Sequence, residues 1–125
     1  MAVIDAQAGN GGERGLLIHA AGPLEQDALA GILRSAANAR AALGAATAIE
    51  VVIQGPGVKL LAAGALSAEA INDARTLEVQ LLACGNSLRS AGLEAGDLAA
   101  GVATVPAAIA HLAQRQWDGW AYARL

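Results

Sequence analysis

Five short apolar segments alternate with helical segments along the chain, and no other feature constrains the fold as strongly. Each has the length of a strand, and β-branched residues are frequent in the second. The predicted strands cover residues 15–20, 48–54, 78–84, 101–105 and 120–125. Strands that alternate with helices favour a mostly parallel sheet with helices on both faces. The chain is therefore predicted to be an α/β protein.

Two of the helices have patterns that predict their ends and their buried faces. Gly22-Pro23 should start the first helix, with Glu25 and Asp27 in its first turn, where the helix dipole favours anions. This helix should end at Gly44 and bury the face formed by Leu29, Ile32, Leu33, Ala36 and Leu43. The last helix should start at Pro106, and its buried face should carry Ile109, Leu112 and Ala113.

A chain of 125 residues is long enough for one domain and too short for two ordinary ones. Residues 1–14 lack sustained periodicity and are rich in glycine, so we expect a flexible lead-in followed by one domain over residues 15–125. The glycine cluster precedes the first strand instead of following one, which does not fit a dinucleotide-binding loop. No organic cofactor is expected.

The hydrophobic fraction of the chain is 55%, and phenylalanine is absent. So small a domain cannot hide that much apolar surface alone, and contacts between identical subunits are the expected outlet. Trp120 and Tyr122 alternate onto one face of the last strand, and such aromatic residues are favoured at buried contacts. A homo-oligomer is therefore predicted.

The charge pattern argues against nucleic acid as a partner, since the net charge is −3 and Lys and Arg are scattered singly. The N-terminus has no pattern of a secretory signal. The longest uncharged stretch, residues 98–110, is too short to span a bilayer. A single cysteine excludes an intrachain disulfide and fits a reducing compartment. We expect a soluble cytoplasmic protein that has no membrane partner.

The carboxyl ends of parallel strands are where α/β proteins bind ligands. His19, Gln54, Cys84 and Val105 stand at these ends in the predicted sheet. Cys84 is the only cysteine, and the helix that follows it would direct its N-terminus at the sulfur. Unpaired N–H groups and the positive end of the helix dipole stabilise a thiolate. Gly85 would leave room beside the sulfur for a sulfur donor.

Two interpretations of Cys84 remain open, a reactive thiol and a small buried hydrophobic residue. Asn86 and Ser87 are interpreted as helix caps, and Asn86 also as an amide able to hold a persulfide or a bound anion. Arg89 would lower the pKa of the thiol if it folded back, or would otherwise extend into solvent.

The segment Gly55-Pro56-Gly57 also permits two interpretations, an anion cradle of backbone N–H groups and a tight turn. Gln54 is a polar candidate on the same edge as Cys84, and His19 is the only base expected there. His111 is predicted to lie mid-helix and partly exposed. Two histidines and one cysteine without ligand spacing predict no metal site.

Three stretches resemble the DsrE/DsrF-like family, also called the YchN-like fold. They are VVIQGPGVKLL (51–61), LLACGNSLRSAGLEAGDLAAGVATVPAAIAHLAQRQ (81–116) and GWAYARL (119–125). The resemblance implies a single three-layer α/β/α domain with a five-stranded parallel sheet, assembled as a trimer or hexamer. Characterised relatives carry sulfur as a persulfide on a cysteine at the end of the third strand, within sulfur-relay systems with dedicated partners. Cys84 matches that cysteine by position.

Two functions from different classes follow. The first is a sulfur carrier or sulfurtransferase in which Cys84 accepts sulfane sulfur and passes it to the thiol of a partner protein. The second is a non-enzymatic homo-oligomeric binding or scaffold domain in which Cys84 is an inert core residue.

Overall fold

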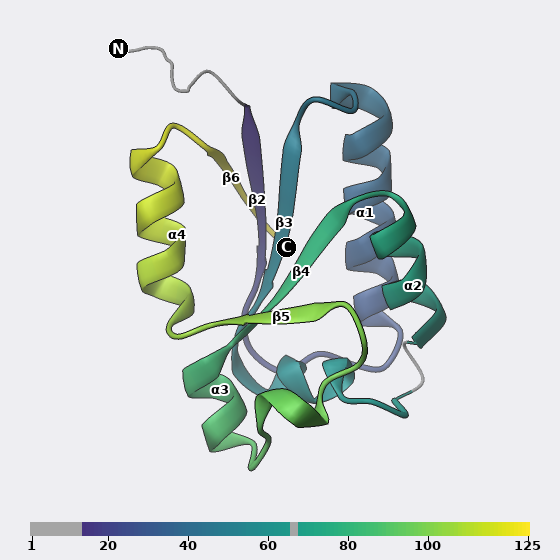
Figure 1. The fold of residues 1–125 in the computed structure, drawn as a ribbon, viewed down its shortest axis with the longest axis vertical. Helices are drawn as coiled ribbons and strands as arrows, with labels where there is room; N and C mark the ends of the chain where they lie inside the picture. The colour runs from purple at the N-terminus through teal and green to yellow at the C-terminus, as the bar shows by residue number, and fades with distance from the viewer. Residues whose placement is uncertain (1–13, 66–67) are drawn as a thin grey trace.

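The computed structural model describes residues 14–65 and 68–125 (Figure 1). The predicted lead-in therefore lies outside the described residues, except for Arg14. The elements in chain order are β2 (Gly15–Ala20), α1 (Ala28–Leu43), β3 (Ala48–Ile53), η1 (Gly55–Leu61), α2 (Ala68–Thr76), β4 (Val79–Cys84), α3 (Gly85–Ser90), η2 (Ala95–Asp97), β5 (Val102–Val105), α4 (Ala108–Trp117) and β6 (Ala121–Arg124), where η1 and η2 are 3-10 helices.

The five strands form one sheet in the order β5-β4-β3-β2-β6, and every neighbouring pair is parallel. The register pairs Leu17 of β2 with Glu50 of β3 on one side and with Tyr122 of β6 on the other. All five predicted strands are present, and no end differs by more than one residue; β6 is one residue shorter at both ends. The predicted parallel α/β fold is confirmed.

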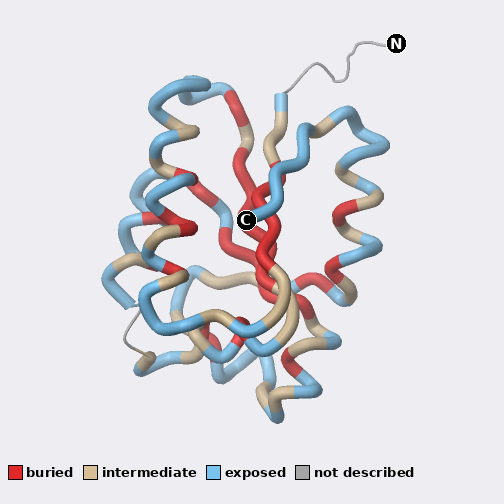
Figure 2. The backbone as a smooth tube through the Cα atoms, turned by 180° about the vertical axis from the view of Figure 1, so that it is seen from behind, coloured by how far each residue is buried: buried red, intermediate tan, exposed pale blue. Residues whose placement is uncertain are grey.

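Helices cover both faces of the sheet and make three layers (Figure 1). α1 and α2 pack on one face, and α4 packs alone on the other. The short helices α3, η1 and η2 gather at the end of the sheet where the strands finish. The longest runs of buried residues lie in the central strands, between the helical layers (Figure 2).

The first helix begins later than predicted. α1 starts at Ala28, and Asp27 occupies the N-cap position without a side-chain cap bond, so neither Glu25 nor Asp27 lies in the first turn. Gly44 ends the helix as expected, with a φ of 92° that favours glycine. Leu43 was expected in the core but is 47% exposed, because the last turn of α1 extends past α2 at the top of Figure 1.

The buried side of α4 also differs from the prediction. Ala108 and Leu112 are buried one turn apart, whereas Ile109 is 64% exposed. Ile109 was assigned to the core because it lies three residues before Leu112. Since α4 forms its layer alone, a residue rotated off the line of Ala108 and Leu112 has no neighbouring helix to cover it.

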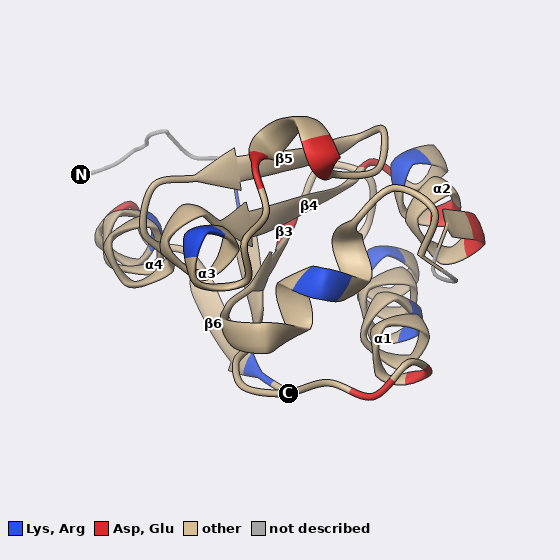
Figure 3. Cartoon of the chain, turned by 90° about the horizontal axis from the view of Figure 1, so that it is seen from below, with Lys and Arg blue, Asp and Glu red and all other residues tan. Residues whose placement is uncertain are grey.

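Charged residues are spread over the elements and are not gathered on one of them (Figure 3). Of the helices in the described part of the chain, none is both long and apolar enough to cross a bilayer.

Candidate functional site: a buried thiol at the carboxyl edge of the sheet

Cys84 is the last residue of β4 and the N-cap residue of α3. The alternation along β4 turns Leu82 and Cys84 toward α4, where they pack with Val105, Ala108 and Leu112. The thiol is consequently buried, and only 2% of the residue is exposed. Cys84 lies at the carboxyl edge of the sheet, as predicted. The sequence had left open whether its side chain is buried or exposed.

Hydrogen-bond donors surround the sulfur. The Ala108 N–H, at the start of α4, donates to Cys84 Sγ over 3.4 Å. Burial raises the pKa of the thiol, but the Ser87 hydroxyl and the backbone N–H groups of Ser87, Ala108 and Asn86 lower it by more in total. The pKa of Cys84 is therefore below its ordinary value of 9.0. Two helix starts, those of α3 and α4, supply these donors.

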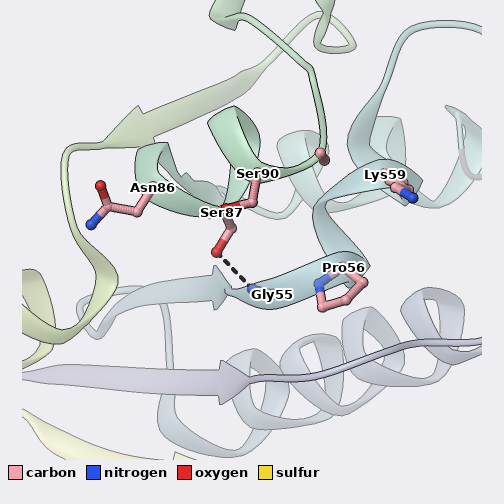
Figure 4. Close-up of a pocket in the computed structure, with 7 residues that line it drawn as sticks. Gly55, Pro56, Lys59, Asn86, Ser87 and Ser90 are labelled. Atoms are coloured by element: carbon pink, nitrogen blue, oxygen red, sulfur yellow. Dashed lines mark hydrogen bonds between the residues drawn. The ribbon is translucent and has the colours of Figure 1, made fainter.

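Ser87 connects the thiol to the neighbouring strand end. The Gly55 N–H donates to Ser87 Oγ over 2.8 Å (Figure 4). Because the Ser87 oxygen accepts this bond, its own proton is free to point at the sulfur of Cys84. Ser87 was interpreted as a helix cap. The N-cap of α3 is Cys84, without a side-chain cap bond, so Ser87 holds two strand ends together instead.

The side chains of Asn86 and Arg89 bond to each other and not to the thiol. Arg89 Nη2 donates to Asn86 Oδ1, and both residues are exposed. Arg89 is not among the groups that lower the pKa of Cys84. Of the two interpretations of Arg89, the solvent-exposed arginine is therefore favoured. Figure 4 shows the Asn86 side chain directed away from Ser87 and Ser90.

The backbone of Gly85 is closely approached on the side where a side chain would lie. A Cβ atom at Gly85 would lie 3.1 Å from the carbonyl oxygens of both Val105 and Pro106. The connection from β5 to α4 thus passes against the backbone of Gly85. The glycine therefore allows this close packing, and it also borders a cavity of about 330 Å³.

His19 and Gln54 lie on the same face as Cys84 and are bonded to each other. Extension of the β3–β4 register places Gln54 beside Cys84. Gln54 Oε1 is 2.9 Å from His19 Nε2, and the Tyr122 hydroxyl is 2.7 Å from His19 Nδ1. With Nε2 donating to Gln54, Nδ1 accepts the hydroxyl proton of Tyr122. His19 is a buried base with both nitrogens paired, and Tyr122 is a polar neighbour that sequence reasoning had assigned only to subunit contacts.

The Gly55-Pro56-Gly57 segment forms the start of η1 and packs against the loop after β2. Gly55 has a φ of 78°, and a Cβ atom there would lie 2.9 Å from the Gly22 nitrogen. At Gly57 a Cβ atom would lie 2.6 Å from a methyl carbon of Leu24. The Gly55 N–H is already bonded to Ser87. These contacts favour the tight-turn interpretation over the anion cradle.

Sequence reasoning missed Glu50, which is buried in the middle of β3 and 4% exposed. Its carboxylate accepts bonds from His111 Nε2 over 2.6 Å and from Arg115 Nη2 over 2.8 Å, both on α4. Arg115 also lies over the Trp120 ring, 4.6 Å from the ring centroid. Two features of the sequence could have indicated this buried ion pair. An acid interrupts the apolar run AIEVVI, and two basic residues stand four positions apart on a later helix. His111 is partly exposed, as predicted.

Within residues 14–65 and 68–125, no group of three or more His, Cys, Asp or Glu side chains could hold a metal ion. The candidate site described here consists of the Cys84 thiol and its hydrogen-bond donors.

Two solved structures share this architecture. MTH1491, a protein of unknown function from Methanobacterium thermoautotrophicum, matches with a TM-score of 0.81 and 28% sequence identity over 89% of this chain and 98% of that chain. The ychN protein from E. coli matches with a TM-score of 0.74 and 17% identity over 90% of this chain and 99% of that chain. No protein-family model and no curated protein matches the chain.

Proposed function

The chain has the YchN-like fold, and on that premise we propose that it is a sulfur carrier in which Cys84 holds sulfane sulfur as a persulfide. The observation that carries the proposal is the lowered pKa of a thiol held by the N–H groups of two helix starts and by Ser87. A thiolate is the nucleophile in sulfur transfer, and these hydrogen-bond donors lower the pKa of Cys84 and so favour that form.

The transfer conserves atoms and electrons. The Cys84 thiolate attacks the outer sulfur of a donor persulfide, the donor S–S bond breaks, and the donor leaves as a thiolate. The product is a Cys84 persulfide. An acceptor thiolate, on a partner protein, then attacks the outer sulfur, and Cys84 leaves as a thiolate. A lower pKa also makes Cys84 a better leaving group in the second step. The chain has no second cysteine to resolve a disulfide, which suits a carrier.

A second candidate is a binding or scaffold domain in which Cys84 is a packing residue. The observation in its favour is the 2% exposure of Cys84. The two candidates differ in the native protein: a carrier thiol is alkylated in the folded state and in a pH range below that of an ordinary cysteine, whereas a packing residue reacts only after unfolding.

Intact mass spectrometry after incubation with a small persulfide tests the proposal. We expect an adduct with the mass of one sulfur atom in the native chain, removed by a reducing thiol. Cys84→Ser should remain folded and show no adduct. An adduct of equal yield on Cys84→Ser, or none on the native chain, would contradict the carrier function.

We further propose that residues 15–125 are the carrier domain, that it works in the cytoplasm, and that it assembles as a trimer or hexamer. Support for assembly comes from large apolar side chains left exposed on α4 and at the end of the chain, including Ile109, Trp117 and Leu125. Light scattering at micromolar concentration should give a multiple of the 12.4 kDa chain mass. A monomer would contradict the assembly.

A further inference from the structure

A cavity of about 250 Å³ lies between η1 and α3, beside the thiol site (Figure 4). Gly55, Pro56 and Lys59 form its η1 wall. The opposite wall is formed by residues of α3 and its C-cap, namely Asn86, Ser87, Ser90 and Ala91. This volume lies just below the usual range for ligand pockets, about 300–1,000 Å³, and therefore suits a small molecule. The lining combines hydroxyl groups with one cation and a short apolar wall.

The cation is Lys59, the only lysine in the chain. Lys59 is exposed and gives η1 its single basic position (Figure 3). Among the residues that the structure describes, no carboxylate lies within 4.0 Å of its ammonium group. An ammonium without a protein counter-ion at the rim of a cavity favours an anionic ligand.

Ser87 joins this cavity to Cys84. Ser87 lines the cavity, and its hydroxyl group accepts the Gly55 N–H and is one of the groups that stabilise the Cys84 thiolate. Ser87 therefore contacts both the cavity and the sulfur of Cys84. Gly85 borders another cavity, of about 330 Å³, but that cavity is not lined by Ser87, whose side chain bonds the sulfur of Cys84.

We propose that the cavity between η1 and α3 binds the sulfur donor, and that the donor is a low-molecular-weight anion. This inference rests on the carrier function. Thiosulfate is the simplest such donor: the Cys84 thiolate attacks its sulfane sulfur, the S–S bond breaks, and sulfite leaves with the bonding electrons. Lys59 holds the charged end of the donor, and the hydroxyl of Ser90 is placed to bond its oxygens.

Two alkylating reagents test the cavity without sulfur chemistry. Iodoacetate is an anion and iodoacetamide is its neutral counterpart, and both consume the Cys84 thiolate. We expect Lys59→Met to lower the ratio of the iodoacetate rate to the iodoacetamide rate by about two- to fivefold. Lys59→Arg should keep the ratio. Arg34→Met is the matched control, since it removes one exposed positive charge from α1.

Sulfur loading from thiosulfate, followed by mass, completes the test, and Lys59→Met should slow it by a similar factor. If Lys59→Met changes the alkylation ratio no more than Arg34→Met does, the cavity is not the anion site, even where persulfide still forms from a protein donor. If neither reagent reaches Cys84 in the native protein, the cavity does not lead to the thiol and the inference is wrong. A lowered ratio without any sulfur loading would support the anion site and contradict the carrier function.

Discussion

The two faces of the sheet are built from the same strands but differ in chemistry. The buried residues of β2, β3 and β4 that face α1 and α2 are all apolar: Ile18, Ala20, Ile49, Val51, Ile53, Val79, Leu81 and Ala83. The face under α4 mixes apolar residues with His19, Glu50 and Cys84. Each of these polar groups has partners on α4, on a neighbouring strand or on Ser87.

One face of the sheet therefore serves mainly the stability of the fold, whereas the other holds the polar groups of the candidate site. Two helices exclude water from the first face, where polar groups would be costly. A single helix covers the second face, and its N-terminus and basic residues pair with the thiol and with Glu50. Because side chains alternate along each strand, both faces are specified by interleaved residues of the same segments.

Leu81 and Leu82 give the sharpest comparison, because they are consecutive on β4 and point to opposite faces. We expect Leu81→Ala to lower the free energy of unfolding by about 3–5 kcal/mol and Leu82→Ala by about 2–3 kcal/mol. We expect the larger loss on the face covered by two helices, because the surrounding side chains there can relax less into the space left by the removed atoms. Urea denaturation of both variants measures this, and an equal or reversed order would break the comparison.

Glu50→Gln tests whether the polar pairs stabilise the α4 face. The amide keeps the shape but loses the charge that Arg115 and His111 bond, so we expect unfolding to require about 1–3 kcal/mol less. Urea denaturation in a double-mutant cycle with Arg115→Met isolates the pair: Glu50→Gln should cost less in that background. Additive losses would show that the two side chains act independently.

Ser87→Ala should affect the thiol more than the fold. Loss of the hydroxyl removes one hydrogen bond that lowers the pKa of Cys84, so the pKa rises toward 9.0 while the backbone donors remain. The pH profile of iodoacetamide alkylation should therefore move to higher pH. The Gly55 N–H also loses its partner, at a cost of about 1 kcal/mol in unfolding. Ser90→Ala, from the same helix, is the control and should leave the profile in place.

The smallest expected effect is the pH dependence of stability. The folded-state pKa of Cys84 is lower than that of the unfolded chain, so ionisation stabilises the folded state. This contribution is complete above about pH 9 and is lost as pH falls through the folded-state pKa. The stability of the native chain relative to Cys84→Ser should accordingly rise with pH over that window. A flat or falling difference in urea denaturation would contradict the lowered pKa.

Local patterns were enough to predict the strands, their parallel arrangement and the place of Cys84. These patterns did not predict correctly which helical residues are buried. Leu43 and Ile109 have helical spacing from core residues, yet their exposure depends on which neighbouring element lies over them. Glu50 was overlooked for the same reason. A buried acid in an apolar strand needs hydrogen-bonding partners, and its partners lie on α4, far away in the sequence.

The sequence by itself determined the order of elements and put a lone thiol between a strand and a helix, because residue periodicity, turn residues and short connections act over a few positions. Tertiary structure alone decided the surroundings of that thiol. Ser87 meets Gly55 across 32 residues of chain, Glu50 meets Arg115 across 65, and His19 meets Tyr122 across 103. Such contacts depend on strand order, register and the packing of α4. A hydrogen bond acts over about 3 Å, so its partners are fixed only once the layers have assembled.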